Sequence, residues 1–219
     1  MARKTLSSKN EYPERFEKVR GLSLRYILSN NATDPKKPGI LFFHGFSFSL
    51  DDWRKVGILD RVVDGGYRFL ALDLPSGKSS KSDHVTFQKV AEYIPMLDEF
   101  LEKVSFSSVK LVLVGPSMGG GFALSYAIAH PNIVAGLVLI SPSLKSIGEE
   151  EIEEIRTPSM LVWGERDNVF PIEEYGKRLK NTMTHSKLVI IKGAGHAAYL
   201  DKPSEFNDLM LDFLDEISE

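Results

Sequence analysis

Three residues whose types could together transfer an acyl group lie in loops that each follow an apolar run of the sequence. These residues are Ser117, Asp167 and His196. A serine hydroxyl is a weak nucleophile on its own, so it needs a general base, and the base needs a group that orients it. The pattern therefore predicts Ser117 as the nucleophile, His196 as the base and Asp167 as the acid that orients the base.

The segment around Ser117 has the form that an exposed nucleophile requires. The sequence Gly115-Pro-Ser-Met-Gly119 fits the pattern G-x-S-x-G, with an apolar strand predicted before it and a helix after it. Glycine at both ends allows a tight turn from which the serine side chain projects near the positive end of the helix. The alternative is a turn without a chemical role. The presence of Asp167 and His196 further along the chain favours the catalytic interpretation.

Both partners of Ser117 have alternative interpretations. His196, in Lys192-Gly-Ala-Gly-His196, could be a solvated loop residue. Glu165 lies in the same loop as Asp167, so its carboxylate could orient the base instead. We favour Asp167 and His196 because the three residues occupy matching places after their strands.

A tetrahedral intermediate on Ser117 also needs hydrogen-bond donors for its oxyanion. The backbone N–H of Met118, directly after the nucleophile, is one expected donor. The second is expected in the loop after the apolar run 39–43, at the N–H of Phe46. Phe46 and Phe48 are also predicted to line the acyl pocket, although aromatic side chains are more often part of a core.

The surrounding elements indicate how these residues are positioned. Strands that alternate with helices predict an α/β fold, with a mostly parallel central sheet and helices on both faces. The carboxyl ends of parallel strands meet at one edge of a sheet, where such folds place their sites. The expected strands are 39–43, 67–72, 109–114, 134–140, 160–163 and 187–191, with an edge hairpin at 16–29; the expected helices are 51–63, 86–104 with a bend at Pro95, 118–129, 172–181 and 203–217.

Composition excludes several classes of protein. The chain of 219 residues has no cysteine, which excludes disulfide scaffolds, thiolate zinc sites and a cysteine nucleophile. A formal net charge of −3 gives no general attraction to nucleic acid or to anionic membranes. No apolar run is long enough to span a membrane, and the first ten residues are polar, so a cytoplasmic location is expected. We expect one domain over 1–219, with 1–15 as a loosely ordered lead-in. Oligomeric state is not predicted.

Other motifs are assigned no chemical role. Gly77-Lys-Ser79 resembles the end of a phosphate-binding loop, but Leu72 occupies the position that requires glycine, so ATP binding is rejected. His44 is expected to brace its loop, and Asp73 is expected to be structural. No residues have the spacing of metal ligands, so neither a metal nor another cofactor is predicted.

With these motifs in place, the chain resembles the α/β-hydrolase fold superfamily over nearly its whole length. The resemblance rests on the chain order Ser, Asp, His and on five segments: His44-Gly-Phe46, Asp73-Leu-Pro-Ser-Gly77, Gly115-Pro-Ser-Met-Gly119, Gly164-Glu-Arg-Asp167 and Gly193-Ala-Gly-His196. Larger members of the superfamily insert a helical cap between the strand that ends near Ile140 and the strand that precedes the acid. Only the short, acidic segment 141–157 lies there in this chain, so the resemblance implies an uncapped site.

More narrowly, the chain looks like the small lidless hydrolases of the factor-B type, first noticed as partners of a general transcription factor. The likeness rests on His44-Gly-Phe-Ser-Phe-Ser49, on 66–75 and on 192–203. Members are associated with hydrolysis of small acyl esters and with acyl transfer that involves lysine side chains and coenzyme A. In that group serine replaces some glycine of the nucleophile turn, whereas 115–119 has the ordinary superfamily form.

The sequence thus predicts a serine carboxyl-ester hydrolase that acts on small, short-chain acyl esters through an acyl-enzyme. Three alternatives stay open: an acyltransferase or deacylase that uses the same acyl-enzyme, a binding protein that keeps the fold without turnover, and C–C bond hydrolysis or cofactor-free perhydrolysis by a similar triad.

Overall fold

A computed structural model of the chain describes residues 12–29, 36–107, 110–145 and 147–218, and every structural statement below refers to them. Most of the predicted lead-in 1–15 lies outside these residues. Its last residue, Arg15, already belongs to a strand.

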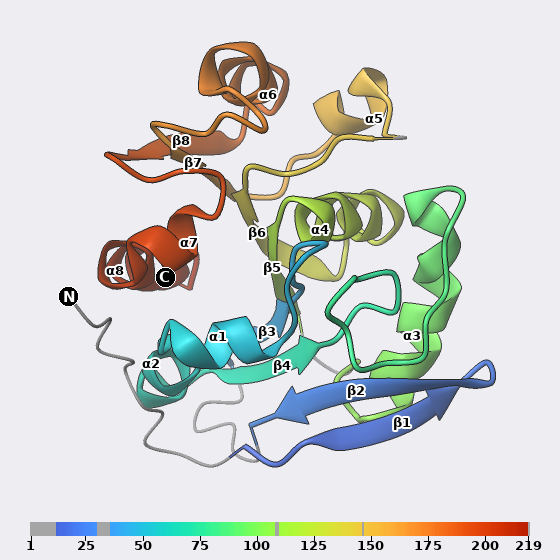
Figure 1. The fold of residues 1–219 in the computed structure, drawn as a ribbon. Helices are drawn as coiled ribbons and strands as arrows, with labels where there is room; N and C mark the ends of the chain where they lie inside the picture. Colours follow the sequence, from blue (N-terminus) through green and yellow to red (C-terminus); the bar gives the residue numbers. More distant parts are fainter. Residues whose placement is uncertain (1–11, 30–35, 108–109, 146, 219) are drawn as a thin grey trace.

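Eight strands form one sheet in the order β1-β2-β4-β3-β5-β6-β7-β8 (Figure 1). Six neighbouring strands are parallel, namely β4, β3, β5, β6, β7 and β8. Strands β1 and β2 form an antiparallel hairpin at the edge of the sheet, where β2 pairs with β4. The predicted fold class and edge hairpin are therefore confirmed. The strands are β1 (Arg15–Val19), β2 (Leu22–Leu28), β3 (Gly39–Phe42), β4 (Arg68–Leu72), β5 (Leu111–Pro116), β6 (Val134–Ile140), β7 (Ser159–Gly164) and β8 (Ser186–Ile191).

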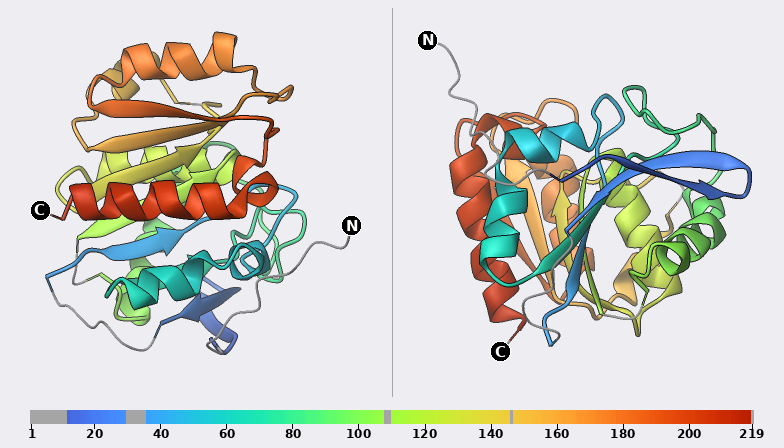
Figure 2. Two further views of the ribbon diagram at one scale, coloured as in Figure 1. Left: turned by 90° about the vertical axis from the view of Figure 1, so that its left-hand side faces the viewer. Right: turned by 90° about the horizontal axis from the view of Figure 1, so that it is seen from below.

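Helices cover both faces of the sheet, as the view from below in Figure 2 shows. One layer holds α1, α2, α7 and α8, and the other holds η1, α3, α4, α5, η2 and α6. The helical segments are α1 (Asp51–Lys55), α2 (Ile58–Asp64), η1 (Val90–Tyr93), α3 (Ile94–Lys103), α4 (Met118–Ala129), α5 (Glu149–Glu153), η2 (Ile172–Gly176), α6 (Lys177–Thr182), α7 (Ala198–Asp201) and α8 (Pro203–Glu216).

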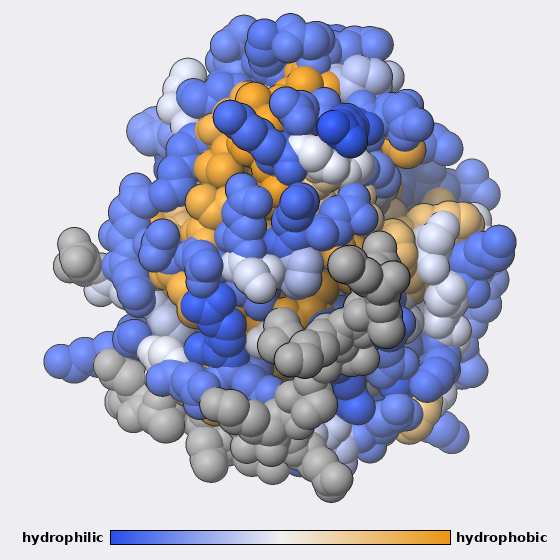
Figure 3. Space-filling model, turned by 60° about the vertical axis from the view of Figure 1, so that its left-hand side comes forward, coloured by the Kyte–Doolittle hydropathy of each residue, from blue (hydrophilic) through white to orange (hydrophobic). Residues whose placement is uncertain are grey.

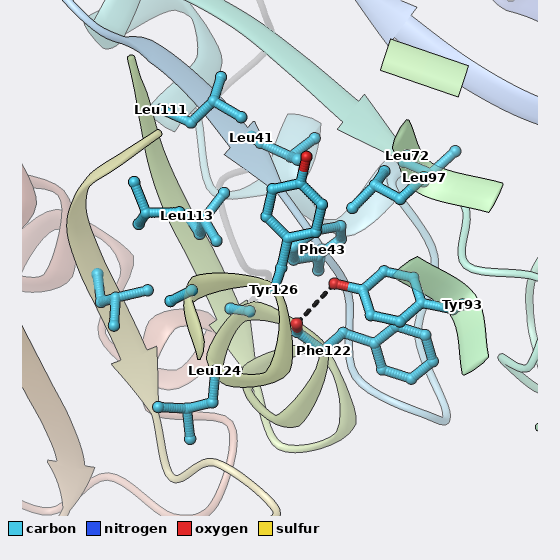
Figure 4. Close-up of a cluster of buried hydrophobic side chains, with 14 of the residues drawn as sticks. Leu41, Phe43, Leu72, Tyr93, Leu97, Leu111, Leu113, Phe122, Leu124 and Tyr126 are labelled. Atoms are coloured by element: carbon cyan, nitrogen blue, oxygen red, sulfur yellow. Dashed lines mark hydrogen bonds between the residues drawn. The ribbon is translucent and has the colours of Figure 1, made fainter. Parts of the chain in front are cut away.

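The central strands are apolar on both sides because helices bury both sides. Every residue of β3, β5 and β7 is buried, as expected of parallel strands with two covered faces. Figure 4 shows the cluster that fixes α4 between β5 and α3. Within it the Tyr93 hydroxyl donates a 2.6 Å hydrogen bond to the carbonyl of Phe122, and the two rings lie 4.3 Å apart. This packing holds the helix that follows the nucleophile.

The last strand, β8, is less covered than the others. Ile191 is buried, but the preceding residues of the strand are half-buried or exposed, and Ile190 is 46 % exposed. The side of the molecule that Figure 3 turns forward is mostly hydrophilic, with apolar side chains visible between polar ones. Among the described helices, none is long and apolar enough to cross a membrane.

Three predicted helices differ from those observed. The helix expected at 51–63 is two helices, because Gly57 adopts a left-handed φ of +73° between them. The helix expected at 86–104 begins only at Val90, as a 3₁₀ turn, and Pro95 lies in the first turn of α3 and bends nothing. Proline suits a first turn because the N–H that it lacks has no partner there. The helix expected at 172–181 begins with a π turn, η2.

Candidate active site

Ser117 stands alone in the sharp turn between β5 and α4. Its φ of +48° and ψ of −114° are strained values for a residue with a side chain, as in a nucleophile elbow. Its N–H donates to the carbonyl of Ile140 on the neighbouring strand, and its own carbonyl accepts from Gly120 and Gly121. The backbone on both sides of the turn is thus fixed, and the half-buried side chain is left facing the carboxyl edge of the sheet.

Glycine is required at both ends of this turn because other backbone lies too close for a side chain. A Cβ on Gly115 would lie 2.3 Å from the carbonyl oxygen of Gly119. A Cβ on Gly119 would lie 2.7 Å from the carbonyl oxygen of His44. The second contact joins the nucleophile turn to the loop after β3, which carries the predicted oxyanion donor Phe46.

Asp167 lies in the loop after β7 and is held by its own loop. Its side chain is fully buried, and one carboxylate oxygen accepts the N–H groups of Val169 and Phe170, both at 2.9 Å. The other oxygen lies 2.8 Å from Nδ1 of His196. A carboxylate accepts, so Nδ1 carries the proton and Nε2 of the neutral ring is free to act as a base.

His196 lies in the loop after β8, which is tied to the loop of Asp167. The N–H of Arg166 donates to the carbonyl of Ala194, and a Cβ on Gly164 would lie only 2.0 Å from the carbonyl oxygen of Gly195. The Phe170 ring packs edge-on against the imidazole at 5.2 Å. Two adjacent parallel strands thus bring Asp167 and His196 together.

The pKa of Asp167 lies below its ordinary value. Burial of the carboxyl works against this, but hydrogen bonds from His196, from the N–H of Phe170 and from Ser141 outweigh it, and the pKa falls. Ser141 follows β6, is fully buried and has a φ of +41°. Its Oγ forms no hydrogen bond within strict geometric limits among the described residues, so its contact with Asp167 is a weaker one. Sequence reasoning missed this neighbour of the carboxylate.

Ser117 and His196 line one pocket of about 250 Å³. Phe46, Phe48 and Tyr199 contribute to the same pocket, so the structure places the two predicted substrate-binding aromatics beside the nucleophile. Phe46 is 54 % exposed at the rim, whereas the Phe48 ring packs against Tyr199. Among the hydrogen bonds of the described residues, none joins Ser117 Oγ to His196. Such bonds are often long before substrate binds.

The predicted oxyanion donors have no hydrogen-bond acceptor in the described part of the chain. Neither the N–H of Phe46 nor that of Met118 takes part in a hydrogen bond there. Met118 begins α4, and the first N–H groups of a helix have no partner within it. Neither N–H group is therefore occupied by another described residue, and their role as oxyanion donors stays a prediction.

A buried ionic cluster supports the loop that carries Phe46. Asp73, after β4, accepts the N–H of Leu50 at 2.7 Å and a 3.0 Å hydrogen bond from Arg25. His44 accepts the N–H of Leu74 at Nε2. The structural roles expected for His44 and Asp73 agree with these contacts.

Arg25 is the central cation of that cluster and was not foreseen from the sequence. Its guanidinium is fully buried and forms ion pairs with Asp73, Asp51 and Glu14. Burial alone would lower the pKa of Arg25, but the hydrogen bonds that its guanidinium donates to the three carboxylates raise it above its ordinary value. Only its place in β2, between apolar neighbours, could have indicated burial.

The remaining candidates lie apart from this arrangement. Glu165 accepts the N–H of Gly193 and is not among the groups that contact the imidazole of His196. In the described ranges, no group of three or more His, Cys, Asp or Glu side chains is placed to hold a metal ion.

Comparisons with known proteins agree with this geometry. The model of the α/β-hydrolase fold family matches residues 38–154 and 143–203. The chain belongs to the α/β-hydrolase fold family. It is 30% identical over 201 residues to human ABHD14B, named as a putative protein-lysine deacylase. The aligned region covers 90% of this chain and 92% of that protein. It is 32% identical over 179 residues to zebrafish (Danio rerio) ABHD14A, and this alignment covers 81% of this chain and 64% of that protein.

Solved structures of this family superpose over nearly the whole chain. The crystal structure of a predicted CIB-like hydrolase from Thermoplasma acidophilum has a TM-score of 0.84 and 28% identity, covering 93% of this chain and 98% of that one. Carboxylesterase CesB from Bacillus subtilis shares the fold, with a TM-score of 0.79 at 18% identity over 94% of this chain and 92% of its own. The chain is therefore a small α/β-hydrolase without a separate cap, as its resemblance to the small lidless hydrolases implied.

Proposed function

We propose that the chain is a serine hydrolase that cleaves small carboxylic esters with short acyl groups. The observation that carries the proposal is the 2.8 Å contact between Asp167 and His196, in a pocket that His196 shares with Ser117. Family membership supports hydrolase chemistry, and the site geometry supports serine as the nucleophile.

The reaction proceeds through an acyl-enzyme. Nε2 of His196 takes the proton of Ser117 as Oγ bonds to the carbonyl carbon of the ester. The N–H groups of Phe46 and Met118 stabilise the oxyanion of the tetrahedral intermediate. When the carbon–oxygen bond of the ester breaks, Nε2 returns the proton to the leaving alcohol. Water then attacks the acyl-enzyme with His196 again as base, so side chains and water complete every step.

The orienting role falls to Asp167. Its carboxylate fixes the tautomer with the proton on Nδ1 and stabilises the imidazolium that forms during each proton transfer. Because hydrogen bonds hold the pKa of Asp167 below its ordinary value, the carboxylate stays ionised as the imidazole becomes charged. The buried side chain keeps this interaction away from water.

A second reaction is favoured by the name of human ABHD14B, which refers to removal of acyl groups from protein lysines. The same acyl-enzyme would form when Ser117 attacks the amide of an acylated lysine, with His196 protonating the leaving amine. A transferase would resolve that acyl-enzyme with a thiol or amine in place of water. A mixture of acylated lysine peptides and competing acceptors, analysed by mass spectrometry, separates these reactions from ester hydrolysis.

The direct test combines labelling and turnover. A fluorophosphonate is expected to add one adduct to the parent and none to Ser117→Ala, as measured by intact mass. The parent is expected to hydrolyse p-nitrophenyl acetate and butyrate, and Ser117→Ala to lose this activity. An unlabelled parent without ester or amide turnover would contradict the proposal and favour a binding protein with the hydrolase fold.

A further inference from the structure

A second cavity, of about 560 Å³, lies beside the nucleophile turn. Its walls come from the loop 142–145 after β6, from α5, and from η2 and α6. Helices α5 and α6 lie side by side at this end of the molecule (Figure 1). The pocket that contains His196 is less than half as large.

The cavity wall is in direct contact with the nucleophile turn. The N–H of Ser143 donates a 2.8 Å hydrogen bond to the carbonyl of Ser117. Pro142 lies so close to the turn that a Cβ on Gly120 would be 2.6 Å from its Cβ. The backbone of the nucleophile turn, which carries Ser117, therefore lies next to this loop.

Phe170 connects the cavity to the other half of the site. Its N–H donates to Asp167, its ring contacts the imidazole of His196, and its other neighbour is the ring of Tyr175 at 5.1 Å. Phe170 and Tyr175 line the cavity, whereas His196 lines only the smaller pocket. Phe170 therefore contacts the imidazole and also lines the cavity.

We propose that this cavity binds the acyl chain of the substrate and accepts an apolar chain of about six to ten carbons. This inference rests on the proposed serine hydrolase activity and extends its acyl range from short to medium chains. The leaving oxygen must take its proton from His196, so the leaving group occupies the smaller pocket, which His196 lines. In this assignment Phe46 and Phe48, which the sequence predicted to line the acyl pocket, contact the leaving group instead. The acyl chain then extends to the opposite side of Ser117, towards Ser143 and the cavity.

The lining suits an uncharged chain. Apolar side chains form most of it, and the four charged residues at the cavity are two acids and two bases, which balance. Arg178 of α6 and Glu149 of α5 pair with each other at 2.6 Å. A volume of about 560 Å³ lies in the range of pockets that bury most of a ligand, about 300–1,000 Å³, and exceeds what an acetyl group needs.

The first experiment measures acyl-length preference. p-Nitrophenyl esters from acetate to decanoate keep the leaving group constant, and kcat/KM is expected to rise about fourfold per methylene until the cavity is filled. A steady fall in kcat/KM beyond butyrate, in a protein that hydrolyses acetate, would overturn the cavity assignment and leave the hydrolase proposal intact.

The second experiment fills the cavity. Leu144 is half-buried in the lining, so Leu144→Trp is expected to lower kcat/KM for octanoate at least about tenfold more than kcat/KM for acetate. Retained acetate hydrolysis shows that the variant is folded. Ile190→Trp, an exposed apolar position on β8 outside the cavity, is the matched control and is expected to change neither rate. Equal rates for Leu144→Trp and the parent on octanoate would overturn the proposal.

A third variant tests which half of the substrate each pocket holds. Val169 lines the smaller pocket and is 55 % exposed, so Val169→Trp is expected to discriminate against bulky alcohols while keeping the acyl-length profile. The reverse outcome, with Val169→Trp truncating the acyl range and Leu144→Trp restricting the alcohol, would overturn the assignment. If fluorophosphonate fails to label the parent at Ser117, both the proposed function and this inference are wrong.

Discussion

Two pairs of imidazole and carboxylate lie at the same edge of the sheet, and they differ in what the ring nitrogens face. His44 and Asp73 follow the adjacent strands β3 and β4, and both side chains are fully buried. Asp167 and His196 follow the adjacent strands β7 and β8, and His196 keeps 20 % of its side chain exposed. The same residue types, in equivalent places, thus form one closed pair and one open pair.

Hydrogen bonding separates the two pairs. Both nitrogens of His44 are occupied, since Nδ1 lies 2.8 Å from the carbonyl of Gly45 and Nε2 accepts the N–H of Leu74. Burial lowers the pKa of His44, so the ring is neutral and fixes the loop. Among the described residues, the His196 ring forms a hydrogen bond through Nδ1 alone, and the residue lines the pocket that contains Ser117. His196, the proposed base, thus keeps one ring nitrogen without a partner among the described residues, whereas both nitrogens of the structural residue His44 are occupied.

Replacing each histidine by alanine is expected to give the largest difference between the two pairs. His196→Ala removes the proposed base and is expected to lower kcat for esters about 10⁶-fold, with little change in the free energy of unfolding. His44→Ala leaves the N–H of Leu74 without its partner inside the protein, so it is expected to lower the free energy of unfolding by about 1–3 kcal/mol. Ester turnover and urea unfolding of both variants measure the contrast. Equal stability losses would contradict the division into base and brace.

Replacing Arg25, the buried cation that pairs with Asp73, is expected to give the next largest effect, a loss of stability. Arg25→Met leaves the fully buried Asp73 without its ion pair, and the free energy of unfolding is expected to fall by about 3–5 kcal/mol. Lys81 pairs with two of the same carboxylates, Asp51 and Glu14, from an exposed position. Lys81→Met is therefore the control and is expected to cost at most about 1 kcal/mol. Similar losses in urea unfolding would show that burial of the cation is unimportant.

The sequence revealed the open pair more completely than the closed one. Glycine, chain order and strand ends predict Ser117, Asp167 and His196, because each lies in a motif with local requirements. Arg25 has no such motif: its acidic partners Asp51 and Asp73 are 26 and 48 residues away and meet it only when β2 joins β4. Sequence patterns show local geometry, whereas contacts between distant segments depend on the completed fold.

Helix boundaries show the same limit. Apolar spacing predicts which residues face the core, and it correctly placed helices on both sides of the sheet. It did not reveal that Gly57 would adopt a left-handed φ and divide one helix into two, or that Pro95 would begin a helix. Both residues are compatible with either arrangement locally, and packing against the sheet decides between them.

The pH dependence of stability provides a weaker test of the ion pairs that Arg25 forms. Burial of Asp51 works against ionisation, but Arg25 outweighs it, and the pKa of Asp51 lies below its ordinary value of 3.8. A hydrogen bond from Arg25 likewise lowers the pKa of Glu14 below 4.5. Lowered native pKa values mean that the unfolded chain binds more protons in acid. The stabilisation is thus fully present above these ordinary values and is lost as pH falls through the native ones.

Removing Arg25 should weaken this dependence. Unfolding free energies of the parent and of Arg25→Met, measured in urea from pH 7 to pH 3, are expected to differ most at pH 7 and to converge in acid. Asp167 has a lowered pKa in both proteins, so its contribution cancels in the difference. A difference that stays constant with pH would show that Arg25 stabilises the fold by packing and not through its carboxylates.

The smallest expected effect sharpens the open pair. The Ser141 hydroxyl helps to lower the pKa of Asp167, and its removal leaves a more basic carboxylate that stabilises the imidazolium of His196 more strongly. Ser141→Ala is therefore expected to move the acid limb of the pH profile of kcat/KM to higher pH, with a loss of only a few-fold at neutral pH.

Ser141→Gly removes the same hydroxyl and also relieves the φ of +41°. It should shift the limb equally while unfolding with a free energy about 1 kcal/mol higher than that of Ser141→Ala. If both variants keep the parent's profile and differ only in stability, Ser141 supports the backbone at the end of β6 and does not tune the carboxylate.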